Sequence, residues 1–185
     1  MDRVCIDASL AVAWLTYERY TAAANALGRE WSSEGVELLA PPVFHAEVVS
    51  VLRQQVFFKR MLPEEGDEAL SICLDIPVRI IEGQELYRKA WSIASELQLP
   101  TCYDSLYLAA AEMNGCEFWT ADKKLVGAAG TGRSWVKWLG EYSQQKKIST
   151  AEPPKLEAPK QEPPKQAIPR HEAPKLDDPG LWRRI

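Results

Sequence analysis

Four acidic side chains stand at points where folding could bring them together around a cation. Asp7 ends an apolar run, Asp122 follows another apolar run, and Asp104 precedes an apolar segment with helical spacing. Glu47 lies one residue away from the apolar stripe of a further amphipathic segment. A carboxylate beside apolar surface is costly unless it is paired or binds a cation. Because the sequence offers no matching set of adjacent basic residues, these acids predict a divalent-ion site.

Each acid also has a purely structural explanation. Asp104, Asp122 and Asp7 could cap the helices that begin beside them, which is a common use of aspartate. Glu47 could pair with Arg53 or face solvent. For each acid taken singly the structural explanation is preferable. Four such acids in one cluster, however, would repel one another unless a divalent ion held them.

The hydrophobic pattern predicts the elements that position these acids. Apolar runs typical of buried strands lie at residues 3–7, 36–40, 78–81, 117–120 and 134–139. Helical patterns lie between them, at residues 10–15, 22–31, 43–59, 63–75, 85–97, 105–113 and 123–128. This alternation predicts an α/β fold, a three-layer α/β/α sandwich with a parallel central sheet. Ligands of such folds bind at the carboxyl ends of the strands, so the residues there are the first candidates for a site.

The composition is that of one domain with an appendage. A chain of 185 residues with 46% apolar residues and a net charge of −4 folds without disulfides or a structural metal. Its four cysteines form no C-x-x-C pair, which argues against zinc fingers, redox motifs and disulfide frameworks. No stretch approaches the roughly 18 apolar residues that span a bilayer, and Asp2 and Arg3 replace the start of a signal peptide. We therefore expect a soluble cytoplasmic protein without membrane contact.

A change of composition divides the chain into a domain, residues 1–142, and a tail, residues 143–185. Of the 13 prolines, 8 lie between Ala151 and Pro179, in a repeat rich in lysine and glutamate. Such a segment cannot build a core, and we expect a disordered, extended and solvated arm. The arm is mildly basic, whereas the domain is acidic. It ends in GLWRRI, which is either an idle terminus or a short docking motif.

Four motifs surround the acids. They are V-C-I-D-A-S with Asp7 and Ser9, A-P-P-V-F-H-A-E-V-V-S-V-L-R with Glu47, Y-D-S-L-Y-L-A-A-A-E with Asp104, and F-W-T-A-D-K-K-L with Thr120 and Asp122. In order, spacing and local context, over roughly residues 3–140, the sequence resembles the PIN domain family, and within it the VapC-like toxin ribonucleases.

The resemblance implies a metal-dependent endoribonuclease that acts on RNA. It implies an acidic pocket that binds Mg²⁺ or Mn²⁺, flanked by two hydroxyl groups, with catalytic residues Asp7, Glu47, Asp104, Asp122, Ser9 and Thr120. It also implies a toxin with a cognate antitoxin protein as partner, and a fold that often forms a homodimer. Lys123 and Lys124 stand where some relatives carry another acid, so a second metal site would lack that ligand.

Metal-based hydrolysis sets the roles expected of the other polar residues. A hard divalent cation supplies both a nucleophilic hydroxide and charge neutralisation, so His45 is not needed as a base and is expected to be structural. Candidate contacts with a polyanion, with ordinary solvated charge as the alternative, are Arg53, Lys59, Arg60, Lys123 and Lys124. Aromatic residues near the acids are expected to pack inside the protein rather than stack on bases, namely Trp14, Trp119 and Tyr103.

Two other function classes stay open. A phosphotransferase or dehalogenase with an aspartyl nucleophile also has Asp at the end of its first strand, but such enzymes usually have a second Asp two residues later, where this chain has Ser9. The other class is a catalytically idle PIN-like module that binds a protein or nucleic acid through its tail. Retention of all four acids favours the nuclease.

Overall fold

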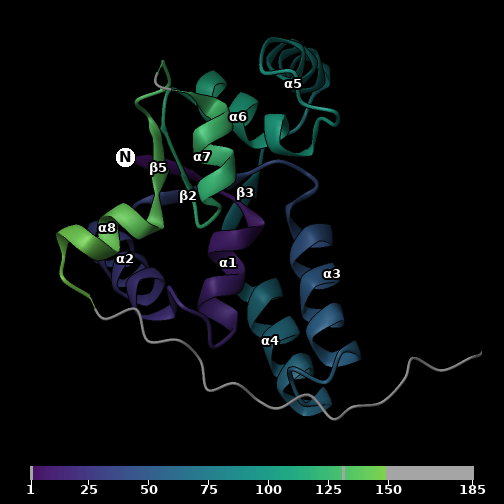
Figure 1. Cartoon of the computed structure of the whole chain (residues 1–185), viewed down its shortest axis with the longest axis vertical. Helices are drawn as coiled ribbons and strands as arrows, with labels where there is room; N and C mark the ends of the chain where they lie inside the picture. Colours follow the sequence, from purple (N-terminus) through teal and green to yellow (C-terminus); the bar gives the residue numbers. More distant parts are fainter. Residues whose placement is uncertain (1, 131, 149–185) are drawn as a thin grey trace, which may run out of the picture.

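Five parallel strands form the single sheet of the computed structural model, which describes residues 2–130 and 132–148 (Figure 1). The strands are β1 (Arg3–Ile6), β2 (Glu37–Ala40), β3 (Val78–Ile80), β4 (Glu117–Thr120) and β5 (Val136–Trp138). Their order is β3-β2-β1-β4-β5, and every pairing is parallel. The predicted parallel sheet is confirmed, with β1 and β4 as central neighbours.

Helices cover both faces of this sheet. They are α1 (Ala8–Leu15), α2 (Thr21–Glu34), α3 (Phe44–Phe57), α4 (Pro63–Asp75), α5 (Gln84–Glu96), α6 (Tyr103–Asn114), α7 (Lys123–Ala129) and α8 (Leu139–Gln145). Along the chain, successive strands from β1 to β3 are added toward one edge of the sheet, and the chain then returns past β1 to add β4 and β5 toward the other edge. Right-handed crossovers therefore place α1 to α4 on one face and α5 to α7 on the other, as Figure 1 shows. The predicted three-layer α/β/α architecture is confirmed.

The core lies between the central strands and the helices beside them. Phe118 of β4 and Leu39 of β2 are completely buried, as are Leu108 of α6 and Phe44 of α3. Strands covered on both faces need apolar residues at successive positions, which explains the unbroken run from Val4 to Ile6 in β1. Within the described part of the chain, no helix has both the length and the apolar character needed to cross a membrane.

An aromatic cluster joins distant parts of the chain on the α1–α4 face. Trp31 of α2 meets Trp14 of α1 at a ring-centroid distance of 6.3 Å and Trp119 of β4 at 5.7 Å, both edge to face. Trp119 in turn meets Tyr142 of α8 at 5.9 Å. Edge-to-face pairs of this kind stabilise a fold beyond the area that they bury. The packing roles predicted for Trp14 and Trp119 are thus confirmed.

Helix α8 differs from the sequence-based expectation of a strand-like run up to Leu139 and a tail from Ser143. The strand β5 ends at Trp138, and α8 continues through Ser143 to Gln145. The Tyr142 hydroxyl donates to Glu30 at 2.8 Å, and buried Ser143 donates to the carbonyl of Ile148 at 3.2 Å. Because of these contacts, the folded part of the chain extends past residue 142. The remainder of the predicted tail, residues 149–185, lies outside the described residues.

Two glycines in helices offer a matched test of this packing. A Cβ atom on Gly140 of α8 would overlap the Trp138 indole ring, whereas a Cβ on Gly127 of α7 would meet nothing within 4 Å. We expect Gly140→Ala to lower the free energy of unfolding by about 1–3 kcal/mol through overpacking. Gly127→Ala should raise it by up to about 1 kcal/mol, because alanine favours helix more than glycine does. Urea denaturation measures both values, and equal effects would contradict this account of α8.

Candidate active site

The pairing of β1 with β4 brings two predicted site residues side by side. Ile6 lies opposite Trp119 in the parallel register, so Asp7, which directly follows β1, and Thr120, the last residue of β4, lie at the same carboxyl edge. The Asp7 backbone N–H continues the pairing by donating to the Trp119 carbonyl at 3.3 Å. Two residues beyond Thr120 the chain reaches Asp122. The sheet itself thus gathers Asp7, Thr120 and Asp122 at one edge.

The Asp7 carboxylate is the centre of a buried hydrogen-bond network. It is only 5% exposed, and it accepts from the Leu10 backbone N–H at 2.9 Å, which caps α1. The Ser9 hydroxyl lies 2.8 and 2.9 Å from its two oxygens, and the Thr120 hydroxyl donates to it at 2.6 Å. Both hydroxyls also accept from the backbone after β4, Ser9 from Ala121 N–H and Thr120 from Asp122 N–H, each at 2.9 Å. The network therefore fixes the carboxylate and the turn that carries Asp122.

Burial dominates the protonation equilibrium of Asp7. It raises the pKa of this carboxyl from 3.8 to about 6, and the negative charge of Asp122 acts in the same direction. The hydrogen bonds from Thr120, Leu10 and Ser9 favour the charged form, but they offset the burial only in part. A carboxylate with this pKa is charged at neutral pH at a cost in stability, and a bound cation would relieve that cost.

Asp122 and Asp104 extend from the edge of the network toward solvent. Asp122 accepts from the Lys124 backbone N–H at 2.7 Å and caps α7, so the capping explanation is confirmed for Asp122 as it is for Asp7. It is wrong for Asp104, because Cys102 occupies the N-cap position of α6 and Asp104 lies inside the first turn. Burial and the charge of Asp122 both raise the pKa of Asp104, although its side chain is exposed. No helix cap accounts for this acid.

Glu47 joins the site from the first turn of α3 through a partner that sequence analysis missed. Tyr107 of α6, which is 2% exposed, donates its hydroxyl to Glu47 Oε2 at 2.5 Å. Burial raises the pKa of Glu47, the charge of Asp104 adds to this, and the bond from Tyr107 opposes both. The suggested pairing of Glu47 with Arg53 is wrong, since Arg53 lies over the Phe57 ring instead. Tyr107 follows Asp104 by three residues, and helical spacing places both on the same face of α6. That spacing is the sequence feature that could have indicated Tyr107 as a site residue.

Each of the four acids repels at least one of the others. Asp122 raises the pKa of Asp7 and of Asp104, and Asp104 raises that of Glu47. None of the four forms an ion pair with another described residue. Carboxylate oxygens of this kind are the donors that Mg²⁺ and Mn²⁺ prefer. In residues 2–130 and 132–148, however, no three acidic, cysteine or histidine side chains already form a metal-binding group.

The other predicted residues fall into two regions. Lys123 lies 4.8 Å from the Trp138 ring centroid, and Trp138 donates to the Ala121 carbonyl at 3.3 Å, so both flank the turn that holds Asp122. Tyr103, expected in the core, is 56% exposed beside Asp104. The basic residues Arg53, Lys59 and Arg60 lie on the last turns of α3 and beyond its end, away from Glu47 in the first turn. The structure does not bring this basic group to the acids.

Comparison with known proteins places this geometry in a family. The family model for the PIN domain matches residues 4–130, which contain all six predicted site residues. The crystal structure of PAE2754 from Pyrobaculum aerophilum aligns with a TM-score of 0.56 at 18% identity, over 78% of this chain and 94% of that chain, and this shows a shared fold. No curated protein matches the chain. Because the family model covers well over half of its length, the chain belongs to the PIN domain family.

Proposed function

We propose that this protein is an Mg²⁺- or Mn²⁺-dependent endoribonuclease whose catalytic acids are Asp7, Glu47, Asp104 and Asp122. PIN domains are generally nucleases, and they generally use divalent metal ions. The observation that carries the proposal is the chain of mutually repelling acids around buried Asp7, which is not balanced by any ion pair within the described residues. Helix capping accounts for Asp7 and Asp122 taken singly. It gives no reason for Asp104 to lie close enough to feel the charge of Asp122, or for Glu47 to lie close enough to feel that of Asp104.

The residues of the site have distinct roles in this proposal. The four carboxylates would hold a divalent cation, and the chemistry that such a cation would supply is a water of lowered pKa and neutralisation of charge on the phosphate. Asp7 is held in one orientation by Ser9, Thr120 and the N-terminus of α1. Tyr107 orients Glu47, and burial together with the Glu47 charge raises the pKa of the phenol, so that it keeps its proton and donates. Asp104 and Asp122 face solvent, where a phosphodiester would approach.

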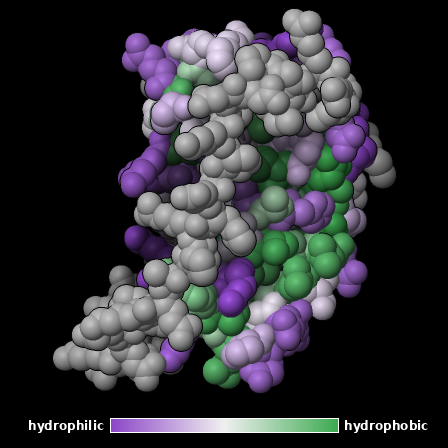
Figure 2. All heavy atoms as spheres, turned by 90° about the vertical axis from the view of Figure 1, so that its right-hand side faces the viewer, coloured by the Kyte–Doolittle hydropathy of each residue, from purple (hydrophilic) through white to green (hydrophobic). Residues whose placement is uncertain are grey.

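The finer biological role rests on the likeness of the four motifs to VapC-like toxins. We infer RNA as the substrate, a toxin–antitoxin pair as the setting, and a cognate antitoxin and a second copy of the chain as protein partners. Figure 2 shows apolar residues gathered on the face that forms the right-hand side of Figure 1. The helices α3 and α4 lie on that side of Figure 1, and the exposed apolar residues at the end of α3 and in α4 are Phe57, Phe58, Ile72 and Leu74. Exposed apolar surface is typical of protein interfaces.

The first prediction tests metal dependence against the alternative of an idle binding module. The full-length protein should cleave single-stranded RNA with Mg²⁺ or Mn²⁺ and lose this activity in EDTA. Asp7→Asn should lower turnover by orders of magnitude, because it weakens both cation binding and formation of the nucleophile. Asp67→Asn, which changes an exposed residue of α4, is the matched control and should cleave at the wild-type rate. Cleavage that survives EDTA, or an Asp7→Asn variant of full activity, would contradict the assignment.

The second prediction concerns the positioning role of Thr120. Thr120→Val keeps the shape of the side chain but removes the hydrogen bond to Asp7 and the acceptor for Asp122 N–H. We expect a loss of activity of about 10–100-fold, as for other residues that orient metal ligands. The pH–rate profile should shift to higher pH, since the lost bond favoured the charged form of Asp7. Thr120→Ser should restore both rate and profile, whereas a merely structural role would leave the profile unmoved.

The third prediction uses the raised pKa of Asp7 in metal-free protein. The native state binds the Asp7 proton more tightly than the unfolded state, so this stabilisation is complete below pH 3.8 and is lost as pH rises through about 6. The loss is about 3 kcal/mol for such a shift. Asp7→Asn lacks this dependence, so its stability relative to wild type should improve between pH 4 and pH 7. Urea denaturation in EDTA at several pH values measures the difference, and a constant difference would contradict the buried, titrating carboxylate.

A further inference from the structure

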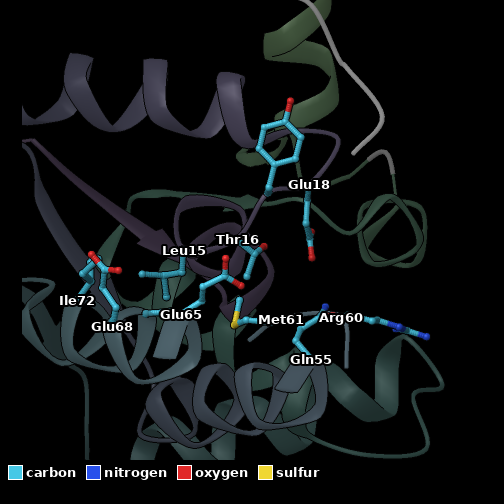
Figure 3. Close-up of a pocket in the computed structure, with 11 residues that line it drawn as sticks. Leu15, Thr16, Glu18, Gln55, Arg60, Met61, Glu65, Glu68 and Ile72 are labelled. Atoms are coloured by element: carbon cyan, nitrogen blue, oxygen red, sulfur yellow. The ribbon is translucent and has the colours of Figure 1, made fainter. Parts of the chain in front are cut away.

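A groove lies at the end of α1 that is opposite to the acids. Its volume is about 760 Å³, and it opens between the last residue of α1, the end of α3 and the helix α4. Its apolar lining includes Leu15, Met61, Ala69 and Ile72, and Ile72 is 51% exposed. In Figure 3 the Met61 sulfur lies near the centre of this lining, beside Glu65, and Ile72 lies at the far end, beyond Leu15. The groove is therefore lined with apolar surface that no described segment covers.

Acidic side chains surround this apolar lining. Glu18, Glu65 and Glu68 all line the groove, and none of them forms an ion pair within residues 2–130 and 132–148. The basic side chain in the lining, Arg60, extends away from Met61 in Figure 3, and its guanidinium lies over the Phe58 ring. An occupant of this groove should therefore combine large apolar side chains with positive charge.

The chain itself contains a segment of that chemistry. Leu181–Ile185 reads L-W-R-R-I, so two guanidinium groups stand between Trp182 and Ile185. Trp182 is the only Phe, Tyr or Trp in the sequence from residue 149 to residue 185. Arg and Trp are the residues most often found at the energetic centres of protein interfaces. Pro179-Gly180 separates this segment from the acidic pair Asp177-Asp178, which would be repelled by the groove.

The connecting sequence is long enough for the segment to reach the groove. Residues 149–180 join Ile148 to the segment, and 32 residues at the roughly 3.1 Å per residue of polyproline II can span about 100 Å. A tether that can span the distance makes docking intramolecular and raises the effective concentration of the segment at the groove. A segment of modest intrinsic affinity therefore gains occupancy without any further contact.

We propose that Leu181–Ile185 docks in the groove between α1, α3 and α4 of its own chain. Trp182 and the aliphatic residues of the segment contact Met61 and Ile72, and the two arginines pair with Glu18, Glu65 and Glu68. Because α1 has eight residues, the groove lies about 12 Å from Asp7, which caps the other end of the helix. Docking thus covers apolar surface and leaves the acidic site open, and it does not depend on the nuclease assignment.

The methionines of the chain provide a direct test with an internal control. In the full-length protein with ¹³C-labelled methionine methyl groups, Trp182 in the groove would shift the Met61 resonance through its ring current. Trp182→Ala should move this resonance and leave that of Met113, on the opposite face of the sheet in α6, unchanged. Leu176→Ala, an apolar change outside the segment, is the matched control and should move neither. A Met61 resonance that is identical in wild type and Trp182→Ala would overturn the proposal.

Charge variants test the predicted pairing. Glu68→Lys should move the Met61 resonance toward its position in Trp182→Ala, whereas Glu64→Lys, which lies in the same helix but does not line the groove, should not. Adding Arg184→Glu to Glu68→Lys should restore the wild-type resonance at least in part, and high salt should weaken docking in wild type. The Met61 shift should not depend on protein concentration. A shift that grows with concentration, together with a dimeric mass, would place the segment in a second copy and would overturn docking within one chain.

Discussion

The fold of this protein is organised around one costly interaction, the burial of the Asp7 carboxylate between β1, α1 and β4. Parallel pairing of the two central strands fixes its position, because Ile6 and Trp119 are in register and the following residues meet at the carboxyl edge. The N-terminus of α1 and the hydroxyls of Ser9 and Thr120 then satisfy its oxygens. The same hydroxyls accept the first two N–H groups after β4, so the turn to Asp122 is held by the network that holds Asp7. The Ser9 and Thr120 hydroxyl oxygens thus connect the Asp7 carboxylate directly to the backbone that follows β4.

This arrangement is destabilising for the metal-free protein and favourable for a nuclease. Four hydrogen-bond contacts do not compensate fully for burial, as the raised pKa of Asp7 shows, and the charges of Asp122 and Asp104 add repulsion along the chain of acids. A destabilising local arrangement of this kind persists only where the surrounding structure is stable enough to hold the side chains in place. Here the fully buried core beside the site, with Phe44, Leu108 and Phe118, provides that structure. The repulsion is then available as binding energy for a divalent cation, because the cation removes it.

Sequence patterns predicted the features that depend on local or periodic signals. Continuous apolar runs are required of strands covered on both faces, so β1 and β4 were recognisable, and with them Asp7 and Asp122 at their ends. The Tyr107–Glu47 bond joins residues 60 positions apart, and no periodicity reports which side chains meet across that distance. Helix α8 has a weakly apolar sequence, and it is held by long-range contacts of Tyr142 with Trp119 and Glu30. Asp104 resembled a cap because aspartate before an apolar helix is often one. In the structure Cys102 occupies the N-cap position of α6, and Asp104 lies in the first turn of the helix.

The acidic site and the proposed docking groove lie at opposite ends of α1. Asp7 begins the helix at the carboxyl edge of the sheet, and Leu15 ends it at the groove. Coupling between two sites requires an element with two arrangements that each ligand biases differently. Helix α1 is fixed on both sides, by the Asp7 cap at its start and by the hydrogen bonds of the Thr16 hydroxyl and backbone N–H to the Val12 carbonyl at its end. Its residues Leu10, Ala11 and Val12 are buried, and close packing of buried residues opposes a shift of the helix along its axis. Occupation of the groove, as proposed, would therefore act on which partners reach that face, because α1 offers no second arrangement through which it could act on the acids.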